Sequence, residues 1–349
     1  MATQIVSVNT SVGKYTYTPE EIISAAHLWL KDNDALKEKF GRFLKSSDIS
    51  KRKFALSLEE ILTLDGAEAR AKTFEVLGSE LGVSALLGNL EKSKIEKEKI
   101  DSMVFVSCTC PILPSIDTLL IEQAGLAENI SRIPIYQHGC AGGVVGLSLL
   151  HKLVQSERYA LLSSVELCSL VFQRENLSAG QLVGSALFGD GSGTVIVGGF
   201  DKGLVITDAK SYLIPNTRHV MGYDIHDNGS HLRLKPELPS IIAKHIPIFL
   251  SDFLSQHQMT HQDLNWWLIH PGGVKILELL EQTFNLHKEQ SAWSREILKQ
   301  IGNLASASIL FVLESFLNSK VAKVGDKGVI IGVGPGLTIE LILFEQKED

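Results

Sequence analysis

The chain has 349 residues, which at about 150 residues per domain predicts two domains or one duplicated fold. Hydrophobic residues make up 44% and charged residues 21%, a composition that excludes a disordered, collagen-like or coiled-coil protein. The formal net charge of −7 argues against a nucleic acid as partner, and no apolar run approaches the ~18 residues of a membrane-spanning helix. Four cysteines are too few for a disulfide framework, and Met1–Thr10 lacks the pattern of a secretory signal. A soluble, cytoplasmic protein is therefore expected.

The first fifty residues are predicted to be mostly helical. Tyr17–Leu44 has apolar side chains at helical spacing, with Thr18 as a suitable N-cap and Pro19 in the first turn. Another helix is expected over residues 73–90. The rest of this half is predicted to contain strands at 103–107, 133–137 and 159–165, a helix at 144–154, and a glycine-rich turn leading into a buried strand at 184–200.

The second half repeats this alternation of strands and helices. Alternating elements of this kind indicate an α/β protein with a largely buried sheet, and we place the boundary between the halves near residue 203. Strands are predicted at 266–269, 328–332 and 337–344, and helices at 274–284 and 305–317.

A cysteine lies where a predicted strand meets a predicted helix. Cys140 follows Gly139 and precedes Gly142 and Gly143. The dipole and the unpaired N–H groups of a helix N-terminus favour the thiolate, which is the reactive form of cysteine. The glycines would also let a substrate approach the sulfur closely. Cys140 is therefore a candidate nucleophile, with a buried structural cysteine as the alternative.

Two further residues could act on a substrate. His270 ends an apolar strand before Pro-Gly-Gly, where it could reach a crevice at the sheet edge, although an ordinary core or surface histidine is the alternative. Asn303 precedes an apolar helix and is first of all a helix N-cap, but its amide could also donate to an oxyanion. Together with the cysteine, these residue types make the constellation of a condensing enzyme.

Five sequence segments surround these residues. They are YQHGCAGG (136–143), GSALFGDGSGTVIVG (184–198), WWLIHPGGVKILE (266–278), GNLASASILFVLE (302–314) and GVGPGLTIELILF (332–344). In order and approximate spacing they resemble the chalcone-synthase-like type III polyketide synthases, and the resemblance covers nearly the whole chain. It implies an α/β, thiolase-like five-layered αβαβα fold of two similar halves, with residues 1–203 carrying the cysteine and 204–349 the histidine and asparagine.

The resemblance also implies a reaction. Cys140 would carry the acyl starter and the growing chain as a thioester, and His270 would hold its thiolate as an ion pair before loading. His270 and Asn303 would then donate to the malonyl thioester oxygen and stabilise the enolate left by loss of CO2. The substrates would be an acyl-CoA starter and malonyl-CoA, with no metal and no organic cofactor. Cyclisation would give a pyrone or a resorcinol- or phloroglucinol-type product.

Other positions match the substrate cavity of the family. Phe188 falls on a gatekeeper phenylalanine between the CoA tunnel and the cavity, and Leu232 replaces the second one. Plant members often have Thr, Thr and Ser at the positions of Cys168, Val171 and Ala305. The cavity should therefore be less polar and suit a fatty acyl starter. The alternative is that these three side chains only pack in the core. Residues also expected to shape the cavity are Gly184, Gly334, Pro335 and Gly336, whereas Glu166 and Asp190 are expected to be structural.

A basic cluster and a short loop match two further features of the family. Lys39, Arg42 and Lys45 resemble the residues that meet the CoA phosphates, with a solvated helix face as the alternative. A homodimer is expected, and Ile112 or Leu113 is nearest to the methionine that crosses the dimer interface in many members. Cys108 and Cys110 form a lone C-x-C, which is weak evidence for a metal, and no metal site is expected.

Three other functions remain open at this point. A ketoacyl-ACP synthase III-like enzyme would use the same three residue types for one condensation on an acyl-carrier protein, although residues 186–191 and 332–340 favour the polyketide enzyme. A non-catalytic thiolase-fold acyl-CoA-binding protein has little support, since all three catalytic residue types are present. A Cys-His hydrolase would release free acid without extending a chain.

Overall fold

A mixed sheet of nine strands forms the frame of the molecule, and the computed structural model describes residues 2–348. The strand order is β11-β12-β13-β8-β1-β7-β6-β4-β5. Its N-terminal and C-terminal parts join where Thr3 and Gln4 of β1 pair with Ile206 and Val205 of β8. The strands of this sheet are β1 (Thr3–Val12), β4 (Ile100–Val106), β5 (Ser131–Ile135), β6 (Tyr159–Leu167), β7 (Asp190–Gly198), β8 (Leu204–Leu213), β11 (Trp266–Ile269), β12 (Lys327–Gly334) and β13 (Thr338–Gln346).

Twelve α-helices and two small antiparallel ribbons complete the described chain. The ribbons pair β2 (Tyr15–Tyr17) with β3 (Arg52–Phe54), and β9 (Met221–His226) with β10 (Gly229–Leu234). The helices are α1 (Pro19–Leu30), α2 (Asp34–Lys45), α3 (Leu58–Thr63), α4 (Ala67–Thr73), α5 (Ser79–Ser93), α6 (Asp117–Ala124), α7 (Gly142–Leu153), α8 (Ala179–Leu187), α9 (Leu238–Ser255), α10 (Val274–Phe284), α11 (Ala292–Ile301) and α12 (Ser308–Ser319). Over residues 2–348, none of these helices is long and apolar enough to cross a membrane.

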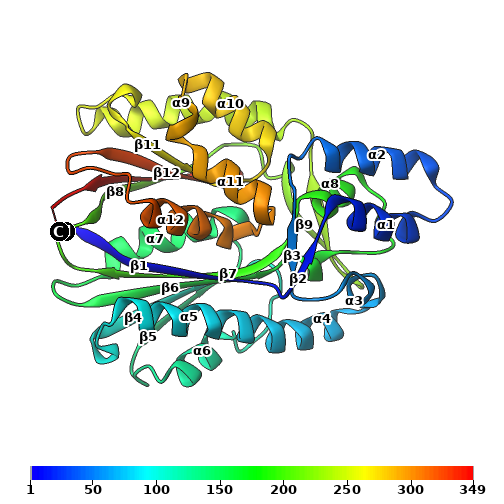
Figure 1. The fold of residues 1–349 in the computed structure, drawn as a ribbon, viewed down its shortest axis with the longest axis horizontal. Helices are drawn as coiled ribbons and strands as arrows, with labels where there is room; N and C mark the ends of the chain where they lie inside the picture. The colour runs from blue at the N-terminus through cyan, green and yellow to red at the C-terminus, as the bar shows by residue number, and fades with distance from the viewer. Residues whose placement is uncertain (1, 349) are drawn as a thin grey trace.

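The helices and the two parts of the sheet form five layers (Figure 1). Helices α7 and α12 lie in the middle, and their buried apolar side chains share one core with strands of both parts. Helices α5 and α6 cover the outer face of the N-terminal part, and α9 and α10 cover that of the C-terminal part. The expected αβαβα architecture is therefore confirmed.

Strand β4 shows why the central strands have continuous apolar runs. Met103 and Phe105 pack in the outer core with α5 and α6, whereas Val104 and Val106 pack in the middle core with α7. Successive side chains of a strand point to opposite faces, so a strand covered by helices on both faces must be apolar throughout.

A helical cap, formed by α1, α2 and α8, stands at one end of the layers (right in Figure 1). Helix α1 begins as predicted, because the Thr18 side chain accepts from the Glu21 N–H while the Glu21 carboxylate accepts from the Thr18 N–H. The ribbon β9–β10 packs against α8 in the same region. This end of the molecule lies opposite to the C-terminus (Figure 1).

The prediction of a mostly helical N-terminus is wrong for the first strand. Residues Thr3–Val12 form a long strand between β7 and β8. The local pattern could not indicate it, because its hydrogen-bonding partners lie some 190 residues further along the chain. The predicted turn at 184 is also wrong, since Gly184 lies inside α8. Strand β11 and helix α10 have the predicted bounds.

Candidate active site

Cys140 lies in a short 3-10 turn, Gly139–Ala141, that leads directly into α7. The sulfur therefore lies at the N-terminal end of the buried helix, as the sequence predicts. The structure shows that these glycines are also required by packing, because a Cβ at Gly143 would collide with the Ser306 carbonyl oxygen and one at Gly142 would lie 2.5 Å from Val106. They allow the start of α7 to pack closely against β4 and against the segment before α12.

The loop Gly334–Gly336 packs on the cysteine turn. A Cβ at Gly139, whose φ is +52°, would lie 2.5 Å from the Pro335 ring, and a Cβ at Gly334 would lie 2.6 Å from Ala141. Both glycines are therefore required by the close approach of two backbones. The structure thus brings the predicted Gly-Pro-Gly loop to the Cys140 turn.

His270 follows β11 and is 4% exposed. Its backbone N–H donates to the Ile331 carbonyl, 2.8 Å away, so the residue continues the pairing of β11 with β12. Among residues 2–348, neither ring nitrogen has a hydrogen-bond partner. A buried imidazole without a protein partner is unusual and leaves both nitrogens available to a substrate.

The side chain of Asn303 is fixed by its oxygen. Oδ1 accepts from the Ala305 N–H at 2.9 Å and from the Ser308 hydroxyl at 3.2 Å, which orients the amide. The amide nitrogen donates to the Gly272 carbonyl, 3.4 Å away and two residues beyond His270. The predicted cap interaction is therefore present just before the helix, and the Asn303 amide lies beside the loop that follows His270.

Burial shifts both titratable groups of the site toward their neutral forms. It raises the pKa of Cys140 to about 12, with a further increase from the Glu166 charge and an opposing effect of the Asn303 hydrogen bond. It lowers the pKa of His270 to about 4. Since each charge is unfavourable alone in a buried site, the ion pair implied by the resemblance can form only if both charges arise together.

The predicted cavity residues gather around the nucleophile. Cys168 and Ala305 are buried in one cluster with Cys108, and Cys140 and Phe188 pack against it. A Cβ at Gly184 would lie 2.6 Å from Leu232 and 3.3 Å from Phe188, so both gatekeeper positions flank this glycine. Side chains from separate segments thus pack together beside Cys140, and Gly184 and Leu232 adjoin this cluster through Phe188.

An apolar pocket, here called the cap pocket, extends from these residues into the helical cap. Cys168, Val171, Gly184, Phe188 and Leu232 line one side of it. The remaining lining comes mostly from apolar side chains of the cap and its neighbours: Ile22, Ala25, Ala26, Trp29, Phe40, Phe54, Leu58, Ile61, Leu62 and Phe172, with Arg52, Ser169, Gln181 and Ser185 as the polar members.

Tyr223 is a site residue that the sequence analysis missed. It lies on β9 directly opposite Leu232 of β10, and its hydroxyl lies near Cys108, Cys168 and Glu166. Burial raises its pKa well above the ordinary value, so the hydroxyl is a neutral hydrogen-bond donor. Recognition of the ribbon would have found it, because the cross-strand neighbour of a gatekeeper must lie near the cavity.

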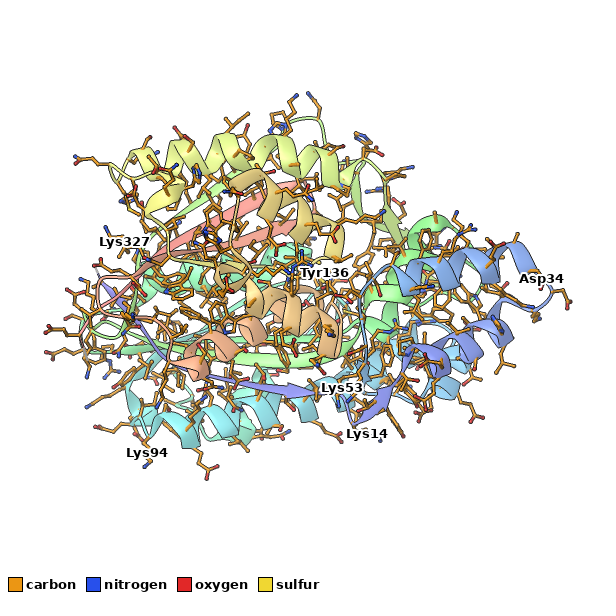
Figure 2. The ribbon with its side chains drawn as sticks, turned by 45° about the horizontal axis from the view of Figure 1, so that its top comes forward. Lys14, Asp34, Lys53, Lys94, Tyr136 and Lys327 are labelled. Atoms are coloured by element: carbon orange, nitrogen blue, oxygen red, sulfur yellow. The ribbon has the colours of Figure 1, made fainter. Side chains whose placement is uncertain are left out.

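Glu166 lies behind the cysteine cluster and is fully buried. Its carboxylate accepts from the Cys108 N–H at 3.0 Å and from the Ser306 hydroxyl. These bonds join the two halves next to the cavity, which agrees with a structural role. Tyr136, which follows β5, lies near the middle of the molecule (Figure 2), and burial raises its pKa, with smaller contributions from Cys108, Cys110 and Glu166.

The predicted CoA-binding residues all lie on α2, at the outer edge of the cap. Lys39 lies over the Phe43 ring at 5.8 Å, and Arg42 pairs with Glu38 at 2.6 Å on the exposed helix surface. Lys45 ends the helix and is exposed. The chain segment from residue 2 to residue 348 contains no cluster of side chains suited to a metal ion.

Comparison with known proteins identifies the family. The family model described as chalcone and stilbene synthases, N-terminal domain, matches residues 20–201, and the corresponding C-terminal domain matches residues 205–346. The chain is 31% identical to 1,3,6,8-tetrahydroxynaphthalene synthase of Streptomyces peucetius subsp. caesius, over 98% of this chain and 93% of that protein. It is also 31% identical to a putative chalcone synthase of Bacillus subtilis (strain 168), over 97% and 98% of the two chains.

Comparison with a solved structure identifies the same family. The crystal structure of 1,3,6,8-tetrahydroxynaphthalene synthase from Streptomyces coelicolor A3(2), a bacterial type III polyketide synthase, matches with a TM-score of 0.94 at 28% identity and covers 99% of both chains. The fold and these matches thus define a thiolase-type condensing enzyme. The chain belongs to the chalcone and stilbene synthase family, and it is a type III polyketide synthase, a transferase that acts by decarboxylative condensation.

Proposed function

We propose that this enzyme loads a fatty acyl-CoA starter on Cys140 and extends it with malonyl-CoA to a pyrone or a resorcinol-type product. The observation that carries this proposal is the cap pocket, whose lining is mostly apolar and which shares Cys168 and Phe188 with the cluster around Cys140. An alkyl chain gains roughly 0.8 kcal/mol for each methylene it buries in such surroundings.

The site residues divide the reaction between them. His270 takes the proton of the Cys140 thiol and the thiolate attacks the starter thioester. The acyl group stays on the Cys140 sulfur, and CoA leaves as the thiol with that proton. His270 and the Asn303 amide then donate to the thioester oxygen of malonyl-CoA, which stabilises the enolate as CO2 departs. The enolate carbon attacks the acyl group on Cys140, the thiolate leaves, and the lengthened chain returns to the sulfur for the next cycle. These steps need neither a metal nor an organic cofactor.

Three features support this division. The Asn303 oxygen is held by Ala305 and Ser308, which fixes the direction of its N–H groups. The ring nitrogens of His270 have no protein partner within residues 2–348. Burial of the site strengthens every hydrogen bond to a developing negative charge.

A second candidate is a synthase of 1,3,6,8-tetrahydroxynaphthalene, the product named for two of the relatives at about 30% identity. Tyr223 favours it, because a hydroxyl beside the cysteine cluster can hydrogen-bond a polar intermediate with many carbonyl groups. The cap pocket would then have no acyl chain to hold.

Product analysis separates the two candidates. The enzyme is given malonyl-CoA alone, and then malonyl-CoA with acyl-CoA starters of two to sixteen carbons, and the products are identified by mass spectrometry. Alkylpyrones or alkylresorcinols made preferentially from long starters support the proposal. A naphthalene product from malonyl-CoA alone supports the second candidate. Activity only with malonyl-ACP would instead indicate a ketoacyl-ACP synthase.

We further propose a cytoplasmic homodimer whose α2 residues Lys39, Arg42 and Lys45 contact the CoA phosphates. A local cluster of positive charge suits a polyanionic substrate in a protein of net charge −7. Leu113 supports the dimer, since 97% of this apolar side chain is exposed in the described chain, and a contact across an interface would cover it.

A further inference from the structure

Arg52 is a buried cation close to the candidate site, and no step of the proposed mechanism uses it. Only 2% of the residue is exposed, and it lies on the short strand β3, between the layers and the helical cap (Figure 1). Its Nη1 donates to the backbone carbonyls of Ser185 and, at 3.2 Å, of Phe188. It therefore holds the end of α8 and the gatekeeper residue together.

The segment that Arg52 holds is paired with the segment that carries Asn303. The Asn303 N–H donates to the Leu187 carbonyl at 2.9 Å, and the Gly189 N–H donates to the Asn303 carbonyl at 3.0 Å. Phe188 and Asn303 thus form a short parallel bridge between two loops that are more than a hundred residues apart in the sequence. A displacement of one loop must move the other.

The Arg52 side chain also packs against the second loop directly. A Cβ at Gly302, whose φ is +81°, would lie 3.3 Å from Arg52 Cγ and 2.7 Å from the Leu187 carbonyl. Just before Arg52, the Ser50 and Lys51 N–H groups donate to the Lys299 carbonyl at 2.8 and 3.3 Å. Arg52 is therefore attached to both sides of the Phe188–Asn303 bridge.

The positive charge of Arg52 strengthens its hold on these two loops. Burial lowers its pKa to about 9, so the guanidinium is still protonated at neutral pH, and the nearby Asp190 opposes the decrease. Asp190 is itself held by the N–H groups of Ala55 and Ser169 and by the Ser169 hydroxyl. A charged donor binds carbonyl oxygens more strongly than a neutral one, which favours a fixed loop over a mobile one.

We propose that Arg52 is a positioning residue, which fixes the gatekeeper Phe188 and, through the backbone bridge, the amide of Asn303. The effect on the reaction rests on the proposed role of Asn303 in malonyl decarboxylation. The effect on the two loops does not depend on that role.

The test replaces Arg52 with Met, which removes the donors, and with Lys, which keeps the charge and one donor group. Arg70→Met is the matched control, because Arg70 is also a buried arginine that donates to two carbonyls, those of Leu170 and Leu64, but it does not contact the bridge. Three quantities are measured on folded protein: the kcat of malonyl-CoA decarboxylation, the rate of Cys140 alkylation by iodoacetamide, and hydrogen–deuterium exchange of peptides covering residues 184–190, 300–305 and 139–143.

We expect Arg52→Met to lower the decarboxylation kcat at least tenfold, with Cys140 alkylation within twofold of wild type, and Arg52→Lys to be intermediate. Exchange should increase in 184–190 and 300–305 but not in 139–143. In an Asn303→Ala background, Arg52→Met should have no further effect on decarboxylation. Arg70→Met should change the melting temperature without this pattern.

Equal losses of decarboxylation and alkylation, or unchanged exchange at the bridge, would overturn the proposal. If Arg52→Met does not fold, Arg52→Lys provides the same comparison, and a wild-type kcat and wild-type exchange in that variant would also overturn it. A wild-type enzyme that does not decarboxylate malonyl-CoA would refute the proposed function instead, and the exchange data would then decide the role of Arg52.

Discussion

Filling the cap pocket should shorten the acyl chain that the enzyme accepts. Ala25 lies on α1, is half-buried and lines the pocket, so a larger side chain there can occupy the pocket with little change to the core. Ala25→Leu adds three carbon atoms. They displace about three methylenes of an alkyl chain, and at roughly 0.8 kcal/mol each the loss is about 2.4 kcal/mol, or roughly 60-fold in kcat/KM.

The assay measures kcat/KM for a series of acyl-CoA starters at saturating malonyl-CoA. Starters long enough to reach α1 should lose on the order of 60-fold, whereas short starters that end near Cys168 should stay within twofold of wild type. Ser24→Leu is the control, because it adds an apolar side chain at the neighbouring, exposed position of the same helix.

Two results would refute this reasoning. An equal loss for short and long starters would mean that the substitution distorts the cap and does not fill a binding pocket. Unchanged selectivity would mean that the acyl chain lies elsewhere, and the proposal of a fatty acyl starter would lose the observation that carries it. Either conclusion requires that the melting temperature of the Ala25→Leu variant is close to that of wild type.

The remaining predictions concern the reacting groups and the assembly. Cys140→Ala should abolish chain extension, measured by product analysis, but retain malonyl decarboxylation, measured by CO2 release. Asn303→Ala should lower the decarboxylation rate about 10²–10³-fold. Similar decarboxylation rates in the two variants would contradict the assigned roles. Burial raises the pKa of Cys140 to about 12 and lowers that of His270 to about 4. The rate of Cys140 alkylation by iodoacetamide should therefore keep rising from about pH 6 to pH 9. A plateau in this range would instead show a stable ion pair of Cys140 and His270. Glu166→Gln should speed this alkylation at pH 7, since the Glu166 charge adds to the effect of burial in raising the Cys140 pKa. An unchanged rate would mean that the carboxyl group is already protonated. Leu113→Glu should weaken a homodimer in sedimentation experiments, and an unaffected dimer would exclude this exposed side chain from the interface.

Local patterns predicted several elements well, and the reason is visible in the structure. Helix α1 begins at the predicted cap because Thr18, Pro19 and Glu21 are neighbours in sequence and form all the interactions of the cap themselves. The apolar run of β4 indicated a strand with two covered faces, and the middle and outer cores cover them. Strand β1 was missed, because its pairing with β7 and β8 depends on residues far away in the chain.

The same distinction holds for the candidate site. The residue types and their segments identified Cys140, His270 and Asn303 as candidates, but their relative orientation depends on contacts across the two halves, such as the close packing of Gly143 on the Ser306 carbonyl. Tyr223 was missed because its position near the cavity depends on the pairing of β9 with β10, which places it opposite Leu232. No pattern in the sequence pointed to Arg52, and the structure shows it buried below the loop that carries Phe188.

The sequence by itself determined the α/β class, the family and the three candidate reacting groups, because these depend on residue types in fixed local order. Only the tertiary structure decided the continuity of the nine-stranded sheet, the cap pocket and the bridge between Phe188 and Asn303. Each of these is made by segments that are distant in the sequence. Their contacts form only when the buried faces of α7 and α12 bring the two halves together, and no local pattern records that approach.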